Sequence, residues 1–141
     1  MSEIQKDDDM VTITVDGQEM QAPKGAMLIE VTDAHNVKVP RFCYHKKLAI
    51  SANCRMCLVE VEKAPKPLPA CATPVMDGMI VHTQSKFARD AQKSVMEFLL
   101  INHPLDCPIC DQGGECELQD VAVAYGEDVS QYSDTKRVVF D

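Results

Sequence analysis

Apolar and polar residues alternate with a period of two over residues 11–15, which is the pattern of a strand with one buried face. Asp16-Gly17 follows, and this dipeptide favours the two-residue turn of a β-hairpin. An extended pattern resumes over residues 19–21, and Pro23 ends it. The sequence therefore predicts a β-hairpin over residues 11–22.

Helical spacing occurs at three places further along the chain. Residues 26–34 place apolar side chains on one face of a short helix. A longer helix is expected from Ser85, a favoured N-cap residue. It should stop before Pro104, because the residue preceding a proline is pushed out of the helical conformation. Residues 118–125 predict a last short helix, with Gly126 as its stop.

Two more strands are expected, over residues 58–62 and 79–83, with a proline-rich turn at 64–69. Residues 40–57 show no periodicity and predict a loop. The mixed pattern of strands and helix gives way to helix alone at Ser85. We therefore expect three parts: a mixed unit over residues 1–84, a helical extension over 85–126, and a polar tail over 127–141 that ends on the strand-like Val138-Val139-Phe140.

Charge and hydropathy exclude some classes of function. The chain has 141 residues, 45% of them hydrophobic, and a formal net charge of −8. This acidic balance argues against nucleic-acid binding, which needs clustered positive charge. The longest apolar stretch, residues 95–101, is interrupted by Glu97 and is far too short to cross a bilayer. Residues 1–10 are acidic and lack the apolar segment of a signal peptide, so membrane association is expected only through partners.

Seven cysteines and one histidine fall into two compact sets. The first has the spacing C-x10-C-x2-C-x13-C and the second H-x3-C-x2-C-x5-C. An odd number of cysteines leaves one thiol unpaired in a disulfide framework, and C-x2-C pairs without a secretion signal indicate metal in a reducing compartment. Thiolate-rich sites favour soft metals and iron–sulfur clusters in particular. The members are Cys43, Cys54, Cys57 and Cys71 in the first set, and His103, Cys107, Cys110 and Cys116 in the second.

The first set keeps the C-x2-C pair and the remote cysteine of plant-type ferredoxins but has ten residues, not four, between its first two ligands. Small residues at 49 and 51–53, beside Cys54, would let the backbone approach inorganic sulfide and donate hydrogen bonds. The remote Cys71 is expected on a neighbouring strand. Structural zinc remains an alternative for either set on spacing alone. The order hairpin, helix, cysteine loop, strand favours iron–sulfur, because it matches the ferredoxin β-grasp order.

Three stretches around the first set, residues 39–45, 54–61 and 69–75, resemble the N-terminal 2Fe–2S domain of the large iron–sulfur subunit of respiratory complex I. The same domain occurs in NAD-reducing hydrogenases, iron-only hydrogenases and some formate dehydrogenases. Residues 103–120 resemble the one-histidine, three-cysteine 4Fe–4S motif of that family almost residue for residue. The resemblance runs from about residue 10 to the end of the chain.

The resemblance implies an α+β fold: a β-grasp 2Fe–2S ferredoxin-like domain followed by a small helical 4Fe–4S extension with one histidine and three cysteines as ligands. It implies one 2Fe–2S cluster on the first set and one 4Fe–4S cluster on the second. Pro104 and Pro108 would stiffen the second loop, and Gly113-Gly114 would permit the turn that brings Cys116 back. An imidazole in place of one thiolate removes negative charge and should raise the potential of that cluster.

The function implied by the resemblance is electron relay from a flavin subunit toward quinone in an NADH:quinone oxidoreductase. The implied partners are the flavin/NADH-binding subunit and other iron–sulfur subunits. The implied place is peripheral, on the cytoplasmic face of a bacterial inner membrane or the matrix side in mitochondria. No Gly-rich phosphate loop and no nucleophile arrangement stand apart from the ligands, so no substrate site is expected on this chain itself.

Two other functions stay open at the level of sequence. One is the diaphorase or electron-transfer subunit of an NAD-linked hydrogenase or formate dehydrogenase. The other, of a different class, is a structural zinc-binding module. Family members continue beyond the equivalent of Asp141 with further cluster ligands, so the chain is expected to be a piece of a longer subunit, a truncated product or a short relative.

Overall fold

The hairpin predicted near the start of the chain forms one edge of a mixed sheet. In the computed structural model, which describes residues 9–138, β1 (Met10–Val15) pairs antiparallel with β2 (Gln18–Pro23). Asp16 and Gly17 connect them with φ angles of 51° and 84°, and a type I′ turn needs positive φ at both central positions. The prediction of a hairpin is confirmed.

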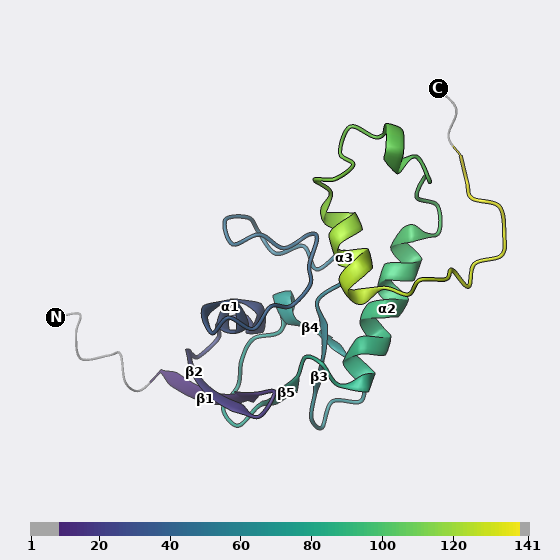
Figure 1. The fold of residues 1–141 in the computed structure, drawn as a ribbon. Helices are drawn as coiled ribbons and strands as arrows, with labels where there is room; N and C mark the ends of the chain where they lie inside the picture. The colour runs from purple at the N-terminus through teal and green to yellow at the C-terminus, as the bar shows by residue number, and fades with distance from the viewer. Residues whose placement is uncertain (1–8, 139–141) are drawn as a thin grey trace.

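Three further strands complete a five-stranded sheet of order β2-β1-β5-β3-β4. β1 and β5 run parallel, and the other neighbouring pairs run antiparallel. Parallel strands need a long crossover, and here the crossover holds α1, the first cysteine loop and the β3–β4 pair (Figure 1). The bounds are Leu28–Ala34 for α1, Leu58–Val61 for β3, Leu68–Pro69 for β4 and Ile80–His82 for β5.

The core of this unit lies between the sheet and α1. Along β1, buried apolar residues alternate with half-buried threonines, as expected of a strand with one face in the core. Leu28 and Ile29 of α1 are fully buried in the same cluster. The core is aliphatic, and its sheet residues include Val11, Ile13, Val15, Met20, Val59 and Val81.

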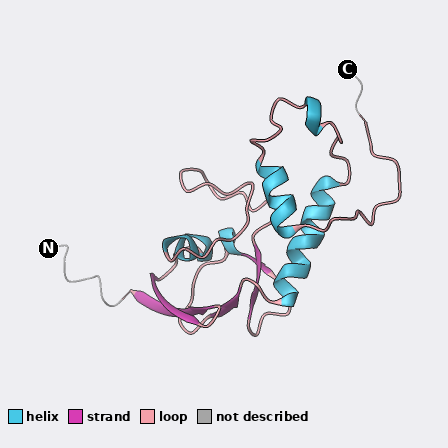
Figure 2. Cartoon of the chain, in the orientation of Figure 1, coloured by secondary structure: helices cyan, strands magenta, loops and turns pink. Residues whose placement is uncertain are grey.

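From Ser85 onward, the regular elements of the described chain are helices, as predicted (Figure 2). The helix α2 (Lys86–Leu100) begins at Ser85, whose hydroxyl oxygen accepts a hydrogen bond from the amide of Ala88 at 3.2 Å. It packs against β3 and against α3 (Glu117–Tyr125). The buried side chain of Gln92 donates to the carbonyl of Leu58 at 3.1 Å, so the helix is fastened to the sheet by a hydrogen bond as well as by packing.

Two local predictions differ from the structure in the region before Cys71. Part of the predicted proline-rich turn is the strand β4, because Leu68 pairs with Val59 of β3. Cys71 was expected on a strand and lies instead in a short 3₁₀ helix, η1 (Ala70–Ala72). Both differences follow from pairing with β3, a long-range contact that local periodicity does not report.

The tail contains neither helix nor strand from residue 127 to residue 138. Val139 and Phe140 of its predicted strand-like end lie outside the described residues. Within residues 9–138, no helix combines the length and the apolarity needed to span a membrane. The predicted architecture, a β-grasp-type mixed sheet followed by a helical extension, is confirmed.

Candidate metal centres

Strand pairing brings Cys57 and Cys71 together. Cys57 directly precedes β3, Cys71 follows β4 after one residue, and the register sets Leu58 opposite Pro69. The amide of Ala70 donates to the carbonyl of Cys57 at 3.0 Å, which extends the pairing by one step. Both cysteines are buried, and the Cys57 thiol is one of the groups that raise the pKa of Cys71. Two candidate ligands that are remote in sequence thus lie side by side at one end of the strand pair.

Cys43 and Cys54 close the first cysteine loop. The amide of Cys54 donates to Sγ of Cys43 at 3.5 Å, and the amide of Met56 donates to Sγ of Cys54 at 3.4 Å. Ala52 and Arg55 have φ angles of 53° and 59°, left-handed conformations that cost residues with a Cβ about 1–2 kcal/mol. These strained residues flank Cys54 and turn the backbone so that amides point at sulfur. Amide hydrogen bonds to sulfur are one of the means by which a protein tunes an iron–sulfur cluster.

Two thiols of the first set, those of Cys43 and Cys71, have pKa values shifted in opposite directions. Burial opposes ionisation of Cys43, but hydrogen bonds from the Cys54 amide and the Ser51 hydroxyl outweigh it, so the pKa of Cys43 is lowered to about 7. Burial raises the pKa of Cys71 to about 12, and its contacts with the other thiols, first that of Cys57, add to the rise. Thiolates that repel one another in this way are stabilised together by a bound metal cation.

The second set surrounds a cavity between the ends of two helices. The loop from α2 to α3 contains a 3₁₀ turn, η2 (Cys107–Ile109), and passes over this cavity. The cavity has a volume of about 960 Å³, and all four residues of the second set line it. Cys107 and Cys110 are exposed and Cys116 is half-buried. The structure therefore brings His103 and three cysteines to one hollow.

The second loop is folded by successive turns, and Gly113 lies close to the backbone carbonyls of Cys107 and Cys110. The amide of Cys110 donates to the carbonyl of Cys107 at 3.3 Å, and the amide of Gly113 donates to the carbonyl of Cys110 at 3.0 Å. A Cβ at position 113 would lie 2.6 Å from the Cys107 carbonyl oxygen and 3.1 Å from that of Cys110. Gly113 avoids a steric clash with two carbonyl oxygens, whereas Gly114, at a φ of 89°, avoids the conformational cost of a left-handed residue with a Cβ.

Cys116 is the N-cap residue of α3. The first amide groups of a helix have no partner within the helix and give its N-terminus a partial positive charge. The start of α3 therefore places this partial positive charge next to Cys116 in the chain.

The tail forms one wall of the same cavity. Nζ of Lys136 donates to the carbonyls of Leu100 and Ile101 at 2.8 Å and 3.1 Å, and the amide of Arg137 donates to Oδ1 of Asn102 at 2.9 Å. A lysine at the C-terminal carbonyls of a helix is stabilised by the helix dipole. These contacts join residues about 35 positions apart, and no local pattern in the sequence pointed to them.

The donor groups fit iron–sulfur clusters. Within the described part of the chain, no three His, Cys, Asp or Glu side chains converge as a site for a single metal ion. A cluster distributes its ligands over several irons, so its donors need not meet at one point. Seven of the eight candidate donors are thiols, amides point at sulfur in the first set, and the second set lines a wide cavity.

Two family matches cover these two sets. Residues 8–86 match the "2Fe-2S iron-sulfur cluster binding domain", and residues 92–130 match the "NADH-ubiquinone oxidoreductase-G iron-sulfur binding region". The first range spans the four cysteines of the first set, and the second spans His103 and the remaining three. Together these matches show one 2Fe–2S cluster and one 4Fe–4S cluster, as the resemblance implied.

Proteins of complex I are similar to this chain at about half of its positions. The chain is 52% identical over 134 residues to NADH dehydrogenase [ubiquinone] iron-sulfur protein 1, mitochondrial, of Solanum tuberosum, covering 95% of this chain and 18% of the relative. It is 50% identical over 132 residues to a subunit of the NADH-quinone oxidoreductase of Rickettsia bellii, covering 94% and 19% respectively. The chain thus spans about a fifth of the length of these curated relatives.

A solved structure shares the fold. The crystal structure of an NAD+-reducing [NiFe]-hydrogenase in the H2-reduced state superposes with a TM-score of 0.82 at 25% identity, covering 92% of this chain and 55% of that one. The resemblance to the large iron–sulfur subunit of complex I is confirmed by the relatives, and the fold is confirmed by this superposition. The match over residues 8–86 takes in more than half of the sequence, and the chain belongs to the family of the 2Fe–2S iron–sulfur cluster binding domain.

Proposed function

We propose that this chain is an electron-transfer module of an NADH:quinone oxidoreductase, which relays electrons from a flavin subunit toward quinone. The observation that carries the proposal is the pair of ligand sets, each gathered by the fold into one place. Identity of about 50% to complex I subunits over nearly the whole chain supports it. Iron–sulfur clusters supply one-electron chemistry, and the residues of this chain would hold and position them.

We assign the ligands residue by residue. Cys43, Cys54, Cys57 and Cys71 hold the 2Fe–2S cluster, and His103, Cys107, Cys110 and Cys116 hold the 4Fe–4S cluster. The support is the spacing of each set, the sulfur-directed amides of the first and the shared cavity of the second. The proposed units are residues 1–84 and 85–126, with 127–141 as a separate tail.

The helix α2 is the physical link between the two proposed sites. Its buried Gln92 bonds to Leu58, which follows Cys57 directly. Its C-terminal end at Leu100 stands three residues before His103. A single helix of 15 residues therefore runs from the neighbourhood of one ligand set to the other. This arrangement supports relay within one chain, since a packed helix holds two sites at a fixed separation.

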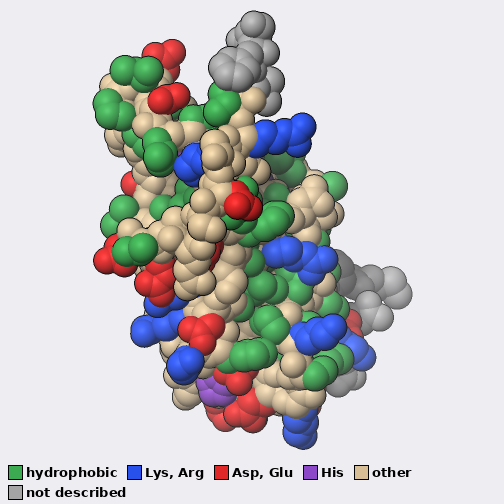
Figure 3. All heavy atoms as spheres, turned by 90° about the vertical axis from the view of Figure 1, so that its right-hand side faces the viewer, with side chains coloured by type: hydrophobic (Ala, Val, Ile, Leu, Met, Phe, Trp, Pro, Cys, Tyr) green, Lys and Arg blue, Asp and Glu red, His purple; other side chains and the backbone are tan. Residues whose placement is uncertain are grey.

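The surface around the second site supports partner subunits. Phe98, Leu105, Ile109 and Val123 are exposed by between 74% and 88%, and exposed apolar surface that is contiguous marks interaction sites. Figure 3 shows apolar side chains interleaved with lysines and arginines on the face that holds α2 and the tail. We propose that a flavin/NADH-binding subunit and other iron–sulfur subunits cover such surfaces.

The proposed location follows from those partners. The chain would lie peripherally at the cytoplasmic face of a bacterial inner membrane, or on the matrix side in a mitochondrion. It would be held there by the subunits that it contacts. The relatives come from mitochondria and from bacteria, which supports both settings.

The second candidate function is the diaphorase or electron-transfer subunit of an NAD-linked hydrogenase or formate dehydrogenase. The superposition on an NAD+-reducing hydrogenase favours it. The identity of 25% to that chain, against about 50% to the complex I subunits, places it second. Reconstitution separates the two: electrons from NADH should reach a quinone only with complex I partners, and hydrogen should reduce the clusters only with hydrogenase partners.

Metal and sulfide analysis of anaerobically purified protein tests the proposal. We expect about six irons and about six acid-labile sulfides per chain, from one two-iron and one four-iron cluster. A brown colour and charge-transfer absorption should accompany them. Two zinc ions and no sulfide, in protein made with iron available, would replace the proposal with the structural zinc module.

A further inference from the structure

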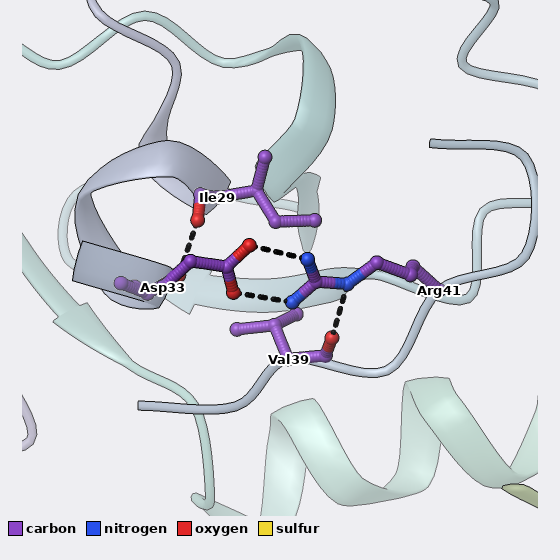
Figure 4. A network of polar contacts seen from close by, with 5 residues as sticks. Ile29, Asp33, Val39 and Arg41 are labelled. Carbon is purple, nitrogen blue, oxygen red and sulfur yellow. Dashed lines mark hydrogen bonds and ion pairs between the residues drawn. The ribbon is translucent and has the colours of Figure 1, made fainter. Parts of the chain in front are cut away.

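An ion pair between Arg41 and Asp33 connects the first cysteine loop to the end of α1 (Figure 4). Both terminal nitrogens of the Arg41 guanidinium bond to the two carboxylate oxygens of Asp33, in the last turn of α1. Nε of Arg41 donates to the carbonyl of Val39 at 3.0 Å. This bidentate geometry is the most specific that an arginine and a carboxylate form. The guanidinium therefore has a fixed position and orientation.

That fixed position is beside the first ligand set. Arg41 precedes Cys43 by two residues, and its guanidinium carbon lies 5.7 Å from the ring centroid of Tyr44, on the other side of that cysteine in the chain. The thiol of Cys57 is close enough to interact electrostatically with the same guanidinium. The Arg41 side chain is only 24% exposed and that of Asp33 is 40% exposed. Partial burial weakens the screening of these two charges by water and salt, so both can act on the first ligand set.

We propose that the Arg41–Asp33 pair sets the reduction potential of the 2Fe–2S site, with Arg41 raising it and Asp33 lowering it. The inference deepens the proposed function and rests on ligation by Cys43 and Cys57. Reduction adds one negative charge to the site. A fixed cation nearby stabilises that charge, a fixed anion opposes it, and the net charge around a cluster is among the quantities that set its potential.

If the Arg41–Asp33 pair has only a structural role, the variants should shift the potential differently. If the pair only held the loop, loss of either partner would loosen the same contact, and both losses would move the potential in the same direction. If the charges act on the site, removing the cation and removing the anion must move the potential in opposite directions. The sign of the shift therefore separates the two roles.

The test uses the whole chain with its clusters loaded and three variants of the pair: Arg41→Gln, Arg41→Lys and Asp33→Asn. Asn keeps one oxygen that accepts from the guanidinium, and Lys keeps the charge without the fork. Matched controls come from the exposed Lys86–Asp90 pair on α2, with side chains 91% and 57% exposed. Lys86→Gln and Asp90→Asn make the same charge changes where solvent screens them.

Potentials are read from a redox titration followed by electron paramagnetic resonance of the two-iron signal. We expect a more negative midpoint for Arg41→Gln, a more positive one for Asp33→Asn, and a smaller shift for Arg41→Lys than for Arg41→Gln. Both controls should match the wild type. Shifts of the same sign in Arg41→Gln and Asp33→Asn would overturn the inference, and so would unchanged midpoints.

The two-iron signal and the midpoint potentials together distinguish a failure of the proposed function from a failure of the inference. A wild-type chain with no two-iron signal after loading would overturn both the ligand assignment and the inference that rests on it. A normal two-iron signal with flat potentials across the variants would overturn the inference alone. Thermal unfolding of the loaded variants identifies any that have lost the fold. If Arg41→Gln is among them, a more negative or unchanged midpoint in Asp33→Asn, which adds no bulk, overturns the inference.

Discussion

Gly113→Ala is the most direct test of the geometry of the second site, because the loop backbone passes very close to position 113. Gly113 is not in the left-handed region, so its backbone conformation accepts alanine. The obstacle is the new methyl group, which would sit 2.6 Å from the carbonyl oxygen of Cys107. That oxygen belongs to the backbone of a proposed ligand residue. The loop must therefore open at a residue that we propose as an iron ligand.

The size of the opening follows from the contact. A Cβ contact of 2.6 Å must lengthen to at least 3.0 Å, a shift of about 0.4 Å. Metal–ligand distances tolerate deviations of about 0.2 Å. The displacement is thus about twice what coordination accepts, and it falls on the turn that joins Cys107 to Cys110. We expect the 4Fe–4S cluster of the variant to be lost or strongly depleted while the 2Fe–2S cluster stays.

Iron and sulfide per chain provide the assay, together with the paramagnetic signals of the reduced protein. Iron should fall from about six per chain to about two, with the two-iron signal intact. Gly114→Ala is the matched control, because its Cβ would meet nothing within 4 Å and it incurs only the cost of a left-handed alanine, about 1–2 kcal/mol. If Gly113→Ala retained a full four-iron signal at an unchanged midpoint, the reasoning from this contact would be refuted.

Three further predictions address the ligands and the link between the sites. Cys57→Ala should abolish the two-iron signal and spare the four-iron signal, and loss of both in a folded protein would contradict separate sites. His103→Cys should keep a four-iron cluster at a lower potential because thiolate adds negative charge, His103→Ala should lose it or leave a three-iron form, and an unchanged midpoint in both would exclude iron ligation by this histidine. Gln92→Leu should lower the free energy of unfolding by about 1–3 kcal/mol, since the Leu58 carbonyl loses a buried donor, and denaturant titration with an unchanged midpoint would show that this hydrogen bond contributes nothing.

Local features of the sequence accounted for most of the elements. Asp16-Gly17 predicts its own turn because few dipeptides adopt positive φ twice in succession. Ser85 caps α2 through an amide only three residues away. The second ligand set is also local, because its four members fall within 14 residues, and turns between neighbours are enough to gather them. Patterns of this kind depend on short-range sterics and hydrogen bonding, which the sequence carries directly.

The first ligand set depended on tertiary structure. Cys71 reaches Cys57 only through the register of β3 and β4, and its place in a 3₁₀ helix rather than a strand was not predicted. The parallel pairing of β1 with β5 likewise joins segments about 65 residues apart. Register follows from which side chains share the core, and a single segment does not contain that information.

The surroundings of the sites were decided by the fold alone. Arg41 lies in a stretch of sequence that resembles the family. Its pairing with Asp33 and the orientation of its guanidinium depend on the packing of the end of α1 against the loop. Lys136 reached the end of α2 through a tail without periodicity. The sequence by itself determined which side chains we propose as donors to iron, because ligand chemistry resides in residue type and spacing. The tertiary structure decided which charges and carbonyls face those donors, because such contacts arise only when distant segments pack.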